Sequence, residues 1–515
     1  MTQEQEGRKI ESVAIIGGGP GGLAALHELL NVSSDGSTLV NKKTSSETPR
    51  FFKNIVLFER ASDIGGSWRF TQSPGTSFSQ FLSLSNVNDL SYNRPNVLFT
   101  SPEVPLNVEE FSYESPLFHE SIKDGVFPPP LEYYDTALYN ELYTNTPDVL
   151  MRFSFQPRTP AVNEPWSPFI NHSQVKAKLD AVAKLPGIER HIRYNSSVQR
   201  VRKVDGKWHV TVREGTNKWY LQKFDAVVIA SGRQYYPYWP QIDGLLDVKN
   251  FISHSKNYRS ADNFTDKDIL IVGCSVSAVD IIKRIYKSAR SVSLVVQKKK
   301  DPKSSWLTRA INIPEISRHT SIKHLSLKNT RVLVEFIDGS KKDYDHILFA
   351  TGYHTYYPFM DQQLFTNTGK INPKDDFQRE RVKNFYLHTF HNQDPTLAHL
   401  GLIKPNLFFH ALETQSIGVA GVFSNIRILD ASIVKCPLPS YEDQVEWERK
   451  REDKIGSNKF EDYEHATLND ILGKKLVSLG PRGRLNPLVI DNDIGKAYDK
   501  GLTVLEELFY QAVKK

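Results

Sequence analysis

Residues 13–22, which read VAIIGGGPGG, constrain the fold of this chain more than any other stretch. A short apolar run leads into a G-x-G-x-x-G loop, and leucines at helical spacing follow the loop. This order predicts a strand, a tight turn and a helix whose first N–H groups can bind a pyrophosphate. Glycine-rich turns also connect elements that bind nothing, so the loop alone leaves that simpler interpretation open.

Each glycine of the loop has its own expected task. Gly17 permits the tight turn, Gly19 lets phosphate oxygens approach the backbone, and Gly22 lets the helix pack closely on its strand. Pro20 and Gly21 lie between them. These five residues are the first predicted cofactor-binding residues.

A dinucleotide loop of this kind needs an acidic residue about 20 positions later, where it accepts hydrogen bonds from the ribose hydroxyls. The candidate is Glu59, at the end of the apolar run 55–58 and 37 positions after Gly22. Residues 31–50 are rich in Ser, Thr and Asn, and we interpret them as a surface insertion. Without this insertion the spacing approaches the expected one, so the loop acquires a ribose partner.

The next stretch, residues 59–68, reads ERASDIGGSW and resembles the E-R-x-x-x-x-G-G-x-W segment of flavin-containing monooxygenases. The resemblance implies that Arg60, Gly66, Ser67 and Trp68 line an FAD. Considered without the family, the two glycines form a loop and the tryptophan is a core residue.

Residues 138–147, LYNELYTNTP, are similar to the L-x-T-N-x-P segment of the same family. The resemblance implies that Thr144 and Asn145 contact FAD, and that Asn145 is the catalytic residue, which helps to hold the oxygenated flavin. An amide suits this task because it offers a donor and an acceptor without a charge. Considered alone, the same residues form a turn before a proline. The resemblance also assigns Val198 and Gln415 to the FAD site.

Residues 268–282 repeat the strand–loop–helix pattern and predict a second dinucleotide site. Ser275 and Ala278 replace the second and third glycines after Gly273. Alanine is common at the third position, whereas serine at the closest approach is expected to weaken nucleotide binding. These three residues and Ser277 are the predicted NADPH contacts; a packing unit without a nucleotide is the simpler alternative.

The residues after the next apolar strand, 293–296, decide which nucleotide is expected. They read QKKK at positions 297–300, where an NAD site would carry an acid. A cation at Lys298 favours the 2′-phosphate of NADPH. The family more often has arginine there, and a lysine lacks its bidentate geometry. A solvated run of charges is the alternative interpretation.

Residues 248–258 resemble the monooxygenase fingerprint F-x-G-x-x-x-H-x-x-x-Y/F. Val248 and Asn250 depart from it, whereas His254 and Tyr258 are retained. Tyr258 stands where Baeyer–Villiger relatives carry tryptophan, which favours the branch of the family that oxygenates heteroatoms.

Composition excludes several other classes of protein. The 515 residues, 39% of them hydrophobic, can form two or three domains, and the net charge of +6 without a basic arm does not suggest nucleic-acid binding. Only Cys274 and Cys436 are present, so neither a disulfide framework, a CxxC redox pair nor a zinc cluster is expected. No metal is predicted, a reducing compartment fits, and the missing CxxC argues against a disulfide reductase.

No stretch of the sequence predicts a membrane span. The longest uncharged apolar run, 269–279, is too short to cross a bilayer, and residues 1–9 are polar. We expect a cytoplasmic protein; peripheral association with the cytosolic face of the endoplasmic reticulum and homo-oligomerisation are both compatible with the sequence. Residues 491–515 are expected to form an amphipathic helix instead of the membrane anchor of the mammalian members.

The sequence therefore predicts an α/β fold with two Rossmann-like dinucleotide-binding domains. The FAD domain is expected at residues 1–240 and 345–515, with an irregular insertion at 71–130. The NADPH domain is expected at 241–344, inserted between the two FAD segments.

The resemblance covers about residues 10–70 and 130–480 and is closest to fungal members of the family. It implies an FAD-dependent NADPH monooxygenase of the N,N-dimethylaniline monooxygenase type, in which NADPH reduces FAD, oxygen adds to the flavin and the peroxyflavin oxygenates a small thiol, sulfide or amine. An NADPH oxidase that releases hydrogen peroxide and a flavin-binding protein without turnover are the alternatives.

Overall fold

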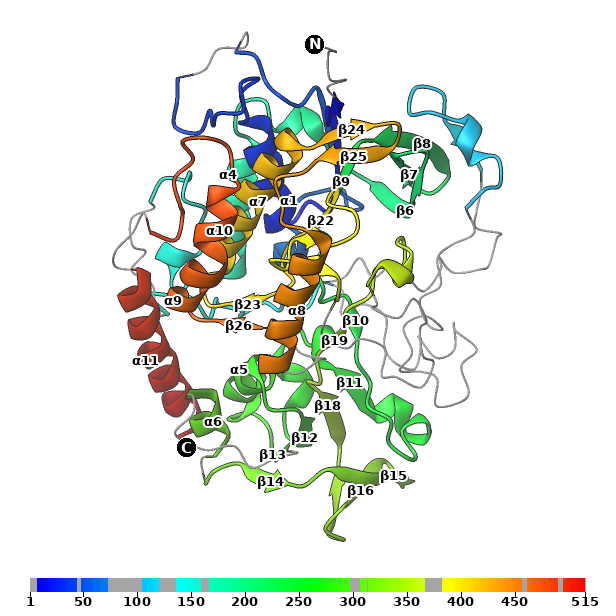
Figure 1. The fold of residues 1–515 in the computed structure, drawn as a ribbon. Coiled ribbons are helices and arrows are strands. Elements are labelled where there is room, and N and C mark those ends of the chain that lie inside the picture. The colour runs from blue at the N-terminus through cyan, green and yellow to red at the C-terminus, as the bar shows by residue number, and fades with distance from the viewer. Residues whose placement is uncertain are drawn as a thin grey trace, which may run out of the picture.

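The computed structural model describes residues 7–43, 48–72, 104–119, 136–158, 166–296, 306–312, 314–365, 382–455, 461–489 and 494–514. In these residues the chain forms two bodies, each built around a parallel sheet (Figure 1). Both predicted strand–loop–helix units are present, one at the centre of each body.

The first body contains a seven-stranded sheet in the order β20-β21-β22-β9-β2-β3-β5. The strands from β22 to β5 are parallel. The central strands read as apolar runs because both faces of the sheet are covered. The strands are β2 (Ser12–Ile16), β3 (Asn54–Phe58), β5 (Ile192–Arg193), β9 (Ala226–Ile229), β20 (Phe385–Tyr386), β21 (Phe390–His391) and β22 (Leu397–His399).

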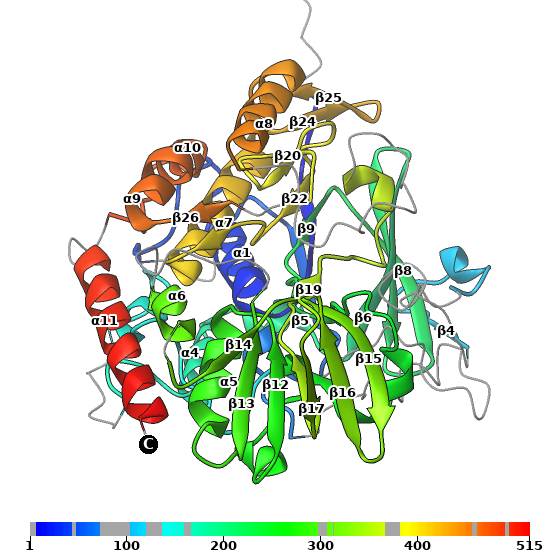
Figure 2. The ribbon, with the colours of Figure 1, turned by 90° about the horizontal axis from the view of Figure 1, so that it is seen from below.

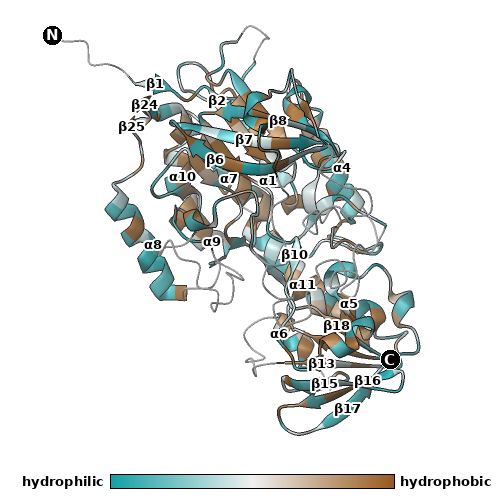
Figure 3. Cartoon of the chain, turned by 90° about the vertical axis from the view of Figure 1, so that its right-hand side faces the viewer, coloured by the Kyte–Doolittle hydropathy of each residue, from teal (hydrophilic) through white to brown (hydrophobic). Residues whose placement is uncertain are grey.

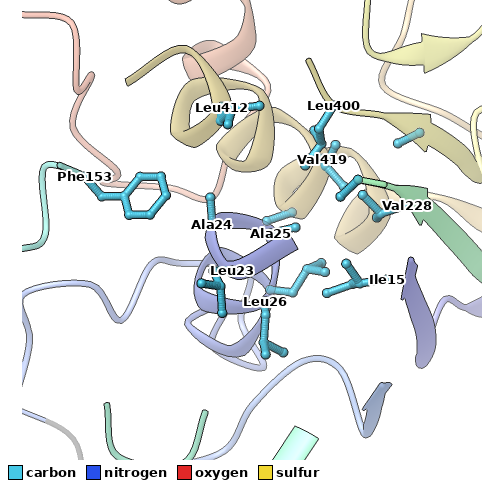
Figure 4. Packing of buried hydrophobic residues seen from close by; sticks show 14 of the residues in the cluster. Ile15, Leu23, Ala24, Ala25, Leu26, Phe153, Val228, Leu400, Leu412 and Val419 are labelled. Atoms are coloured by element: carbon cyan, nitrogen blue, oxygen red, sulfur yellow. The ribbon is translucent and has the colours of Figure 1, made fainter. Parts of the chain in front are cut away.

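Helices cover one face of this sheet, and a four-stranded antiparallel sheet covers the other. Ile15 and Val228 belong to the helix-side core with the leucines of α1 (Figure 4), whereas Ala14 and Ile16 pack toward the antiparallel sheet. Alternate residues of a strand point to opposite faces, which explains this division. The covering elements are α1 (Pro20–Leu30), α4 (His172–Ala183), α7 (Phe408–Asn425), β4 (Leu117–Phe118), β6 (Ser196–Val204), β7 (Lys207–Glu214) and β8 (Lys218–Phe224).

The second body repeats this three-layer plan on a parallel sheet in the order β11-β18-β12-β13-β14. Ile269 and Ile271 pack against α5, whereas Leu270 and Val272 pack toward a three-stranded antiparallel sheet. Its elements are β11 (Ile252–His254), β12 (Asp268–Val272), α5 (Val276–Ile285), β13 (Ser291–Val295), α6 (Trp306–Ile311), β14 (Ser317–His319), β15 (Ile322–Lys328), β16 (Arg331–Phe336), β17 (Lys341–Tyr344) and β18 (His346–Phe349).

An antiparallel pair, β10 (Tyr236–Pro237) and β19 (Tyr353–His354), joins the two bodies, because the chain crosses here once in each direction. The boundary expected after residue 344 falls too early, since β18 lies inside the second sheet. The buried strand β18 completes the sheet of the second body, and a turn of small residues follows it. The chain returns to the first body only at β19.

The C-terminal helix α11 (Ile494–Val513) also departs from the expected division. The expected FAD domain includes this helix, yet Phe509 and Val513 pack with Ile281 and Ile285 in a core of the second body. The helix lies beside α5 and α6 (Figure 2). Hydrophobic periodicity predicts such an amphipathic helix but does not say which surface covers its apolar face.

Part of the insertion expected to be irregular belongs to a sheet, because β4 pairs with β8. Within 71–130, only residues 71–72 and 104–119 are described. The remaining elements are peripheral, and Figure 3 shows that α8 is mostly hydrophilic. They are β1 (Arg8–Lys9), β23 (Lys404–Pro405), β24 (Arg427–Leu429), β25 (Ser432–Lys435), α8 (Tyr441–Ile455), β26 (Asp462–Tyr463), α9 (His465–Leu468) and α10 (Lys474–Ser478).

Candidate active site

The first glycine loop, between β2 and α1, has the shape that a bound pyrophosphate requires. Gly17 has φ +110°, and a Cβ there would lie 2.7 Å from the Ala230 carbonyl oxygen. A Cβ on Gly22 would lie 1.9 Å from the Gly17 carbonyl oxygen, which is an overlap. Gly19 caps α1 without a side-chain hydrogen bond, and Gly66 of the second glycine turn faces it. The N–H groups of the first helical turn are therefore left for a ligand.

Glu59, the residue predicted to bind the ribose, directly follows β3 and contacts the glycine loop. Its carboxylate accepts hydrogen bonds from the Gly18 N–H at 2.7 Å and the Ala61 N–H at 2.8 Å. The carboxylate thus holds the glycine loop and the turn after β3 together. Charge-assisted bonds of this kind are stronger than neutral ones.

A solvent-connected cavity of about 780 Å³ adjoins this carboxylate. Gly17, Glu59, Arg60 and Val198 line it, four of the residues predicted to bind FAD. Tyr235, which the sequence analysis did not select, also lines it, and the Arg60 guanidinium lies 4.3 Å from the centre of the Tyr235 ring. The residues present fit the adenosine half of FAD: an open helix N-terminus, a carboxylate beside the glycine loop and an aromatic side chain in the cavity wall.

A larger cavity of about 1300 Å³ lies between the two bodies. It brings together residues that are far apart in the sequence: Ser67, Trp68, Thr144 and Asn145 from the first body, and Ser277 from the second. The structure therefore gathers four predicted FAD contacts and one predicted NADPH contact around one space. Hydride transfer between two cofactors requires such a shared space.

Thr144 and Asn145 differ in environment although they are neighbours. Thr144 is 3% exposed, and its hydroxyl donates to the Thr146 carbonyl at 2.7 Å and accepts from the Ile170 N–H at 3.2 Å. Asn145 is exposed and lines the cavity. The threonine therefore fixes the turn, and Asn145 beside it lines the cavity.

The second glycine loop, between β12 and α5, has the same turn geometry. Gly273 has φ +115°, and a Cβ there would lie 2.4 Å from the Ala350 carbonyl oxygen. Ser275 caps α5 in an extended conformation (φ −103°) without a side-chain cap hydrogen bond. Ala278 is fully buried. The loop fits a nucleotide pyrophosphate, and Lys298 lies outside the described residues.

Gln415 is placed differently from the other predicted FAD contacts. It is 1% exposed, its carbonyl accepts from the Gly401 N–H at 3.0 Å, and its amide donates to the His388 carbonyl and the Thr389 hydroxyl. Gln415 lines neither cavity described above. Its geometry is that of a buried brace between α7 and the loop after β22, and a direct contact with FAD stays a prediction.

The fingerprint residues lie in the core of the interdomain region. The His254 Nδ1 accepts from the Lys256 N–H at 3.1 Å, and burial lowers the pKa of His254 to about 3, so the imidazole is neutral. Tyr258 is buried against Tyr139, with ring centres 4.9 Å apart. Both residues support the fold around the cavity.

Sequence reasoning missed several residues that line the larger cavity. Tyr235 and Tyr353 lie beside the crossing between the bodies, and Leu505 and Leu508 come from α11. Burial raises the pKa of both tyrosines, so they are neutral donors at physiological pH. No motif marks Tyr235, Leu505 or Leu508, because they reach the site through the docking of elements distant in sequence.

The fold and these two cavities define a flavoprotein oxidoreductase with a second nucleotide site. Comparison with known proteins agrees: a family model described as pyridine nucleotide-disulphide oxidoreductase matches residues 153–388. The chain is 28% identical over 470 residues to the flavin-containing monooxygenase iboF of Amanita muscaria, covering 81% of this chain and 79% of that protein. It is 25% identical over 411 residues to the trimethylamine monooxygenase of Roseovarius sp. (strain 217), covering 80% and 74%.

Among solved structures, the S-allyl-L-cysteine S-oxygenase from Allium sativum matches with a TM-score of 0.63 over 98% of this chain and 95% of that chain, at 22% identity. This likeness confirms the two-domain Rossmann-type fold. The chain is an FAD- and NADPH-dependent oxidoreductase related to the flavin-containing monooxygenases, and the resemblance found in the sequence is confirmed. Within the described residues, no helix has the length and apolar character needed to cross a membrane.

Proposed function

We propose that this chain is an NADPH- and O2-dependent flavin monooxygenase that oxygenates a soft nucleophile, a thiol, sulfide or amine. The observation that carries the proposal is the cavity between the two bodies, where Trp68 and Asn145 share one space with Ser277. The named activities of the relatives, trimethylamine monooxygenase among them, support it.

The two glycine loops divide the cofactors between them. We assign FAD to the first body, at Gly17, Gly19, Gly22, Glu59 and the cavity beside them. NADPH is assigned to the loop of the second body and to Lys298, whose charge suits a 2′-phosphate. When bound, FAD supplies the electron transfer and oxygen activation that no side chain provides.

We assign Asn145 the role of a hydrogen-bonding group beside the flavin. Its amide can orient polar atoms there, but it has no acidic proton to give them. Its neutral amide faces the cavity, and Thr144 holds the turn that presents it. With FAD bound, an acidic or cationic side chain at this place would offer a proton to the activated oxygen and so favour its release as hydrogen peroxide, whereas the amide of Asn145 would not. A fixed amide at this position therefore favours oxygen transfer over peroxide release.

The substitution Asn145→Ala tests this function. We expect NADPH oxidation to continue while the yield of oxygenated thiol, sulfide or amine per NADPH falls about tenfold or more and hydrogen peroxide rises, as loss of one preorganised donor suggests. Asn263→Ala, an exposed asparagine of the second body, is the matched control. An unchanged product yield in Asn145→Ala would contradict the assigned role.

The same assay separates the two alternatives. An NADPH oxidase would convert NADPH and oxygen to hydrogen peroxide in the unaltered chain, with no oxygenated product from any of the three substrate classes. A flavin-binding protein without turnover would leave the flavin absorbance unchanged on anaerobic addition of NADPH. The proposal requires both product and anaerobic bleaching.

A further inference from the structure

Arg284, in the last turn of α5, has hydrogen-bond donors that the described residues leave unused. Its side chain is only 7% exposed, yet Nε and Nη2 have no hydrogen-bond partner among the described residues. Nη1 lies 3.5 Å from Oε2 of Glu141, at the outer limit of a hydrogen bond. Buried donors without a partner destabilise a protein and are rare. The unused donors of Arg284 therefore indicate a ligand.

The two unused nitrogens lie on one edge of the guanidinium, which we call the fork of Arg284. Two parallel N–H groups on such an edge match the two oxygens of a carboxylate. Glu141 does not fill the fork, because its contact is with Nη1 and 70% of its side chain is exposed. An exposed pair of this kind contributes little, since water screens it. The fork thus stays open to a second oxyanion.

Trp166 brings this guanidinium to the cavity between the two bodies. The indole lines the cavity, and Cζ of Arg284 lies 4.9 Å from the centre of its ring. The ring attracts the cation but offers no oxygen to accept from the fork. Leu142, the neighbour of Glu141 in the chain, lines the same cavity. A molecule in the cavity therefore meets Arg284 at the end formed by Trp166 and Leu142.

The charges around Trp166 leave a positive excess at this end of the cavity. The Lys283 ammonium lies 5.1 Å from the centre of the same ring, but it forms an ion pair of 2.7 Å with Asp280. That pair is neutral as a whole, so the charge of Arg284 is the one that a buried group has yet to balance among the described residues. A negative group here would be attracted more strongly than in water, because the surroundings are partly dry.

The phosphates of the nucleotide are the other source of an oxyanion, and the fold places them elsewhere. The nine positions from Ser275 to Arg284 correspond to about 13 Å along the helix axis. The pyrophosphate is expected at the loop, and the 2′-phosphate is assigned to Lys298, which follows β13. Strands β12 and β13 are parallel and end at the edge of the sheet where α5 begins. Arg284 lies at the other end of this helix.

We propose that Arg284 binds a carboxylate of the substrate, at the end of the cavity where Trp166 lies. The substrate is then an acid whose thiol, sulfide or amine group lies elsewhere in the molecule, on the side of Asn145. This inference rests on the proposed function and adds an anionic group to its substrate. It makes Arg284 a determinant of specificity for charge and selects no particular heteroatom.

Matched acids and amides test the proposal on the FAD-loaded full chain. The probes are ω-dimethylamino and ω-methylsulfanyl acids from propanoic to hexanoic, each with its primary amide, titrated by calorimetry at constant ionic strength. In the unaltered chain, the best acid should bind about tenfold to a hundredfold more tightly than its amide, as a charged hydrogen-bonded pair suggests. Arg284→Met should abolish this preference and leave the amide unaffected. Lys287→Met removes an exposed cation just beyond α5 and should retain the preference.

Glu141→Gln is a second test, which does not depend on how well Arg284→Met folds. The exposed carboxylate of Glu141 competes for the same guanidinium, so the neutral glutamine should tighten binding of the acid about twofold to threefold. The affinity of the amide should stay unchanged. Weaker binding of the acid in Glu141→Gln would count against the proposal.

Equal affinities of acid and amide in the unaltered chain would overturn the proposal, as would a preference that survives in Arg284→Met. A titration with NADP+ tests the other source of an oxyanion: if Arg284→Met weakens NADP+ and leaves the acids unaffected, the fork serves the nucleotide and the proposal is wrong. Oxygenated product is measured separately. Acids that bind through Arg284 but are never oxygenated would refute the proposed function and still support the carboxylate site.

Discussion

The two strand–loop–helix units, β2–α1 and β12–α5, form the same tight turn, but their helices are packed differently. In each, a glycine with φ above +100° faces the carbonyl oxygen of a residue that follows the neighbouring strand, Gly17 against Ala230 and Gly273 against Ala350. The turn itself is thus equivalent in the two units. The difference lies in the helix that follows it.

Helix α1 is buried along its whole length, whereas α5 buries one face. Gly22 has no room for a Cβ, and its counterpart Ala278 carries one in a packed core. The first loop therefore lies within the interior, and the second lies near the surface under a helix with an open side. This contrast suits one cofactor that stays bound and another that must enter and leave.

A large effect on stability is expected from Gly22→Ala. Its new methyl would overlap the Gly17 carbonyl, so we expect a loss of stability of about 3 kcal/mol or more, the upper part of the range for overpacking. Denaturant unfolding and the flavin content of the purified protein measure it. Ala278→Gly is the mirror variant and should cost only about 1 kcal/mol. Similar losses of stability in the two variants would contradict the inferred difference in packing between α1 and α5.

The two bodies should also differ in how much an arginine that pairs with two carboxylates stabilises them. Arg484 is 2% exposed and pairs with Glu28 of α1 and Glu413 of α7, at 3.0 and 2.5 Å. Arg484→Met removes the guanidinium that pairs with both buried carboxylates, which is expected to cost about 3–5 kcal/mol in unfolding free energy.

Arg331 is the matched position in the second body. It pairs with Asp268 and Asp345 at 2.8 Å but is 29% exposed, so water screens the interaction. Arg331→Met should cost about 1 kcal/mol or less. Chemical denaturation of both variants measures the difference in unfolding free energy. An equal loss of stability would show that burial does not determine how much these ion pairs stabilise the protein.

Glu59→Gln removes the charge but keeps the volume of the ribose-side carboxylate. Because that carboxylate accepts two backbone N–H bonds and is predicted to bind the ribose, FAD affinity should fall about tenfold to a hundredfold. Titration of the apoprotein with FAD gives the dissociation constant. NADPH affinity, measured on the same variant reconstituted with excess FAD, should stay unchanged.

The smallest expected change is that of Ser275→Gly, which makes the second loop more like the first. Ser275 has an extended backbone, so glycine relieves no backbone strain there, but it removes a side chain from the expected closest approach of the pyrophosphate. We expect NADPH to bind about threefold more tightly, with FAD unaffected. Weaker NADPH binding would show instead that the serine hydroxyl contributes a hydrogen bond.

Local sequence signals predicted the parts of this molecule that local chemistry determines. Both glycine loops, their flanking strands and helices, and the carboxylate at Glu59 follow from spacing and residue type. The motif resemblance selected Trp68 and Asn145, which the fold brings to one cavity. Whether they touch the flavin stays a prediction.

Long-range packing determined what the sequence did not reveal. The strand pattern at β18 does not say which sheet it completes, and the apolar face of α11 does not say which body covers it. A buried amide such as Gln415 can bind a cofactor or brace the backbone, and only its partners distinguish the two. Tyr235 reaches both cavities because two distant segments meet around it.

The central claim is that both loops serve one oxygenating site, and double-mixing stopped-flow spectroscopy tests it most directly. The FAD-loaded protein is first mixed anaerobically with NADPH and then with oxygenated buffer. We predict rapid bleaching of the flavin, followed by the absorbance of a peroxyflavin that decays faster when a thiol, sulfide or amine is present. Bleaching followed by direct return of oxidised flavin, with no intermediate and no effect of substrate, would contradict it.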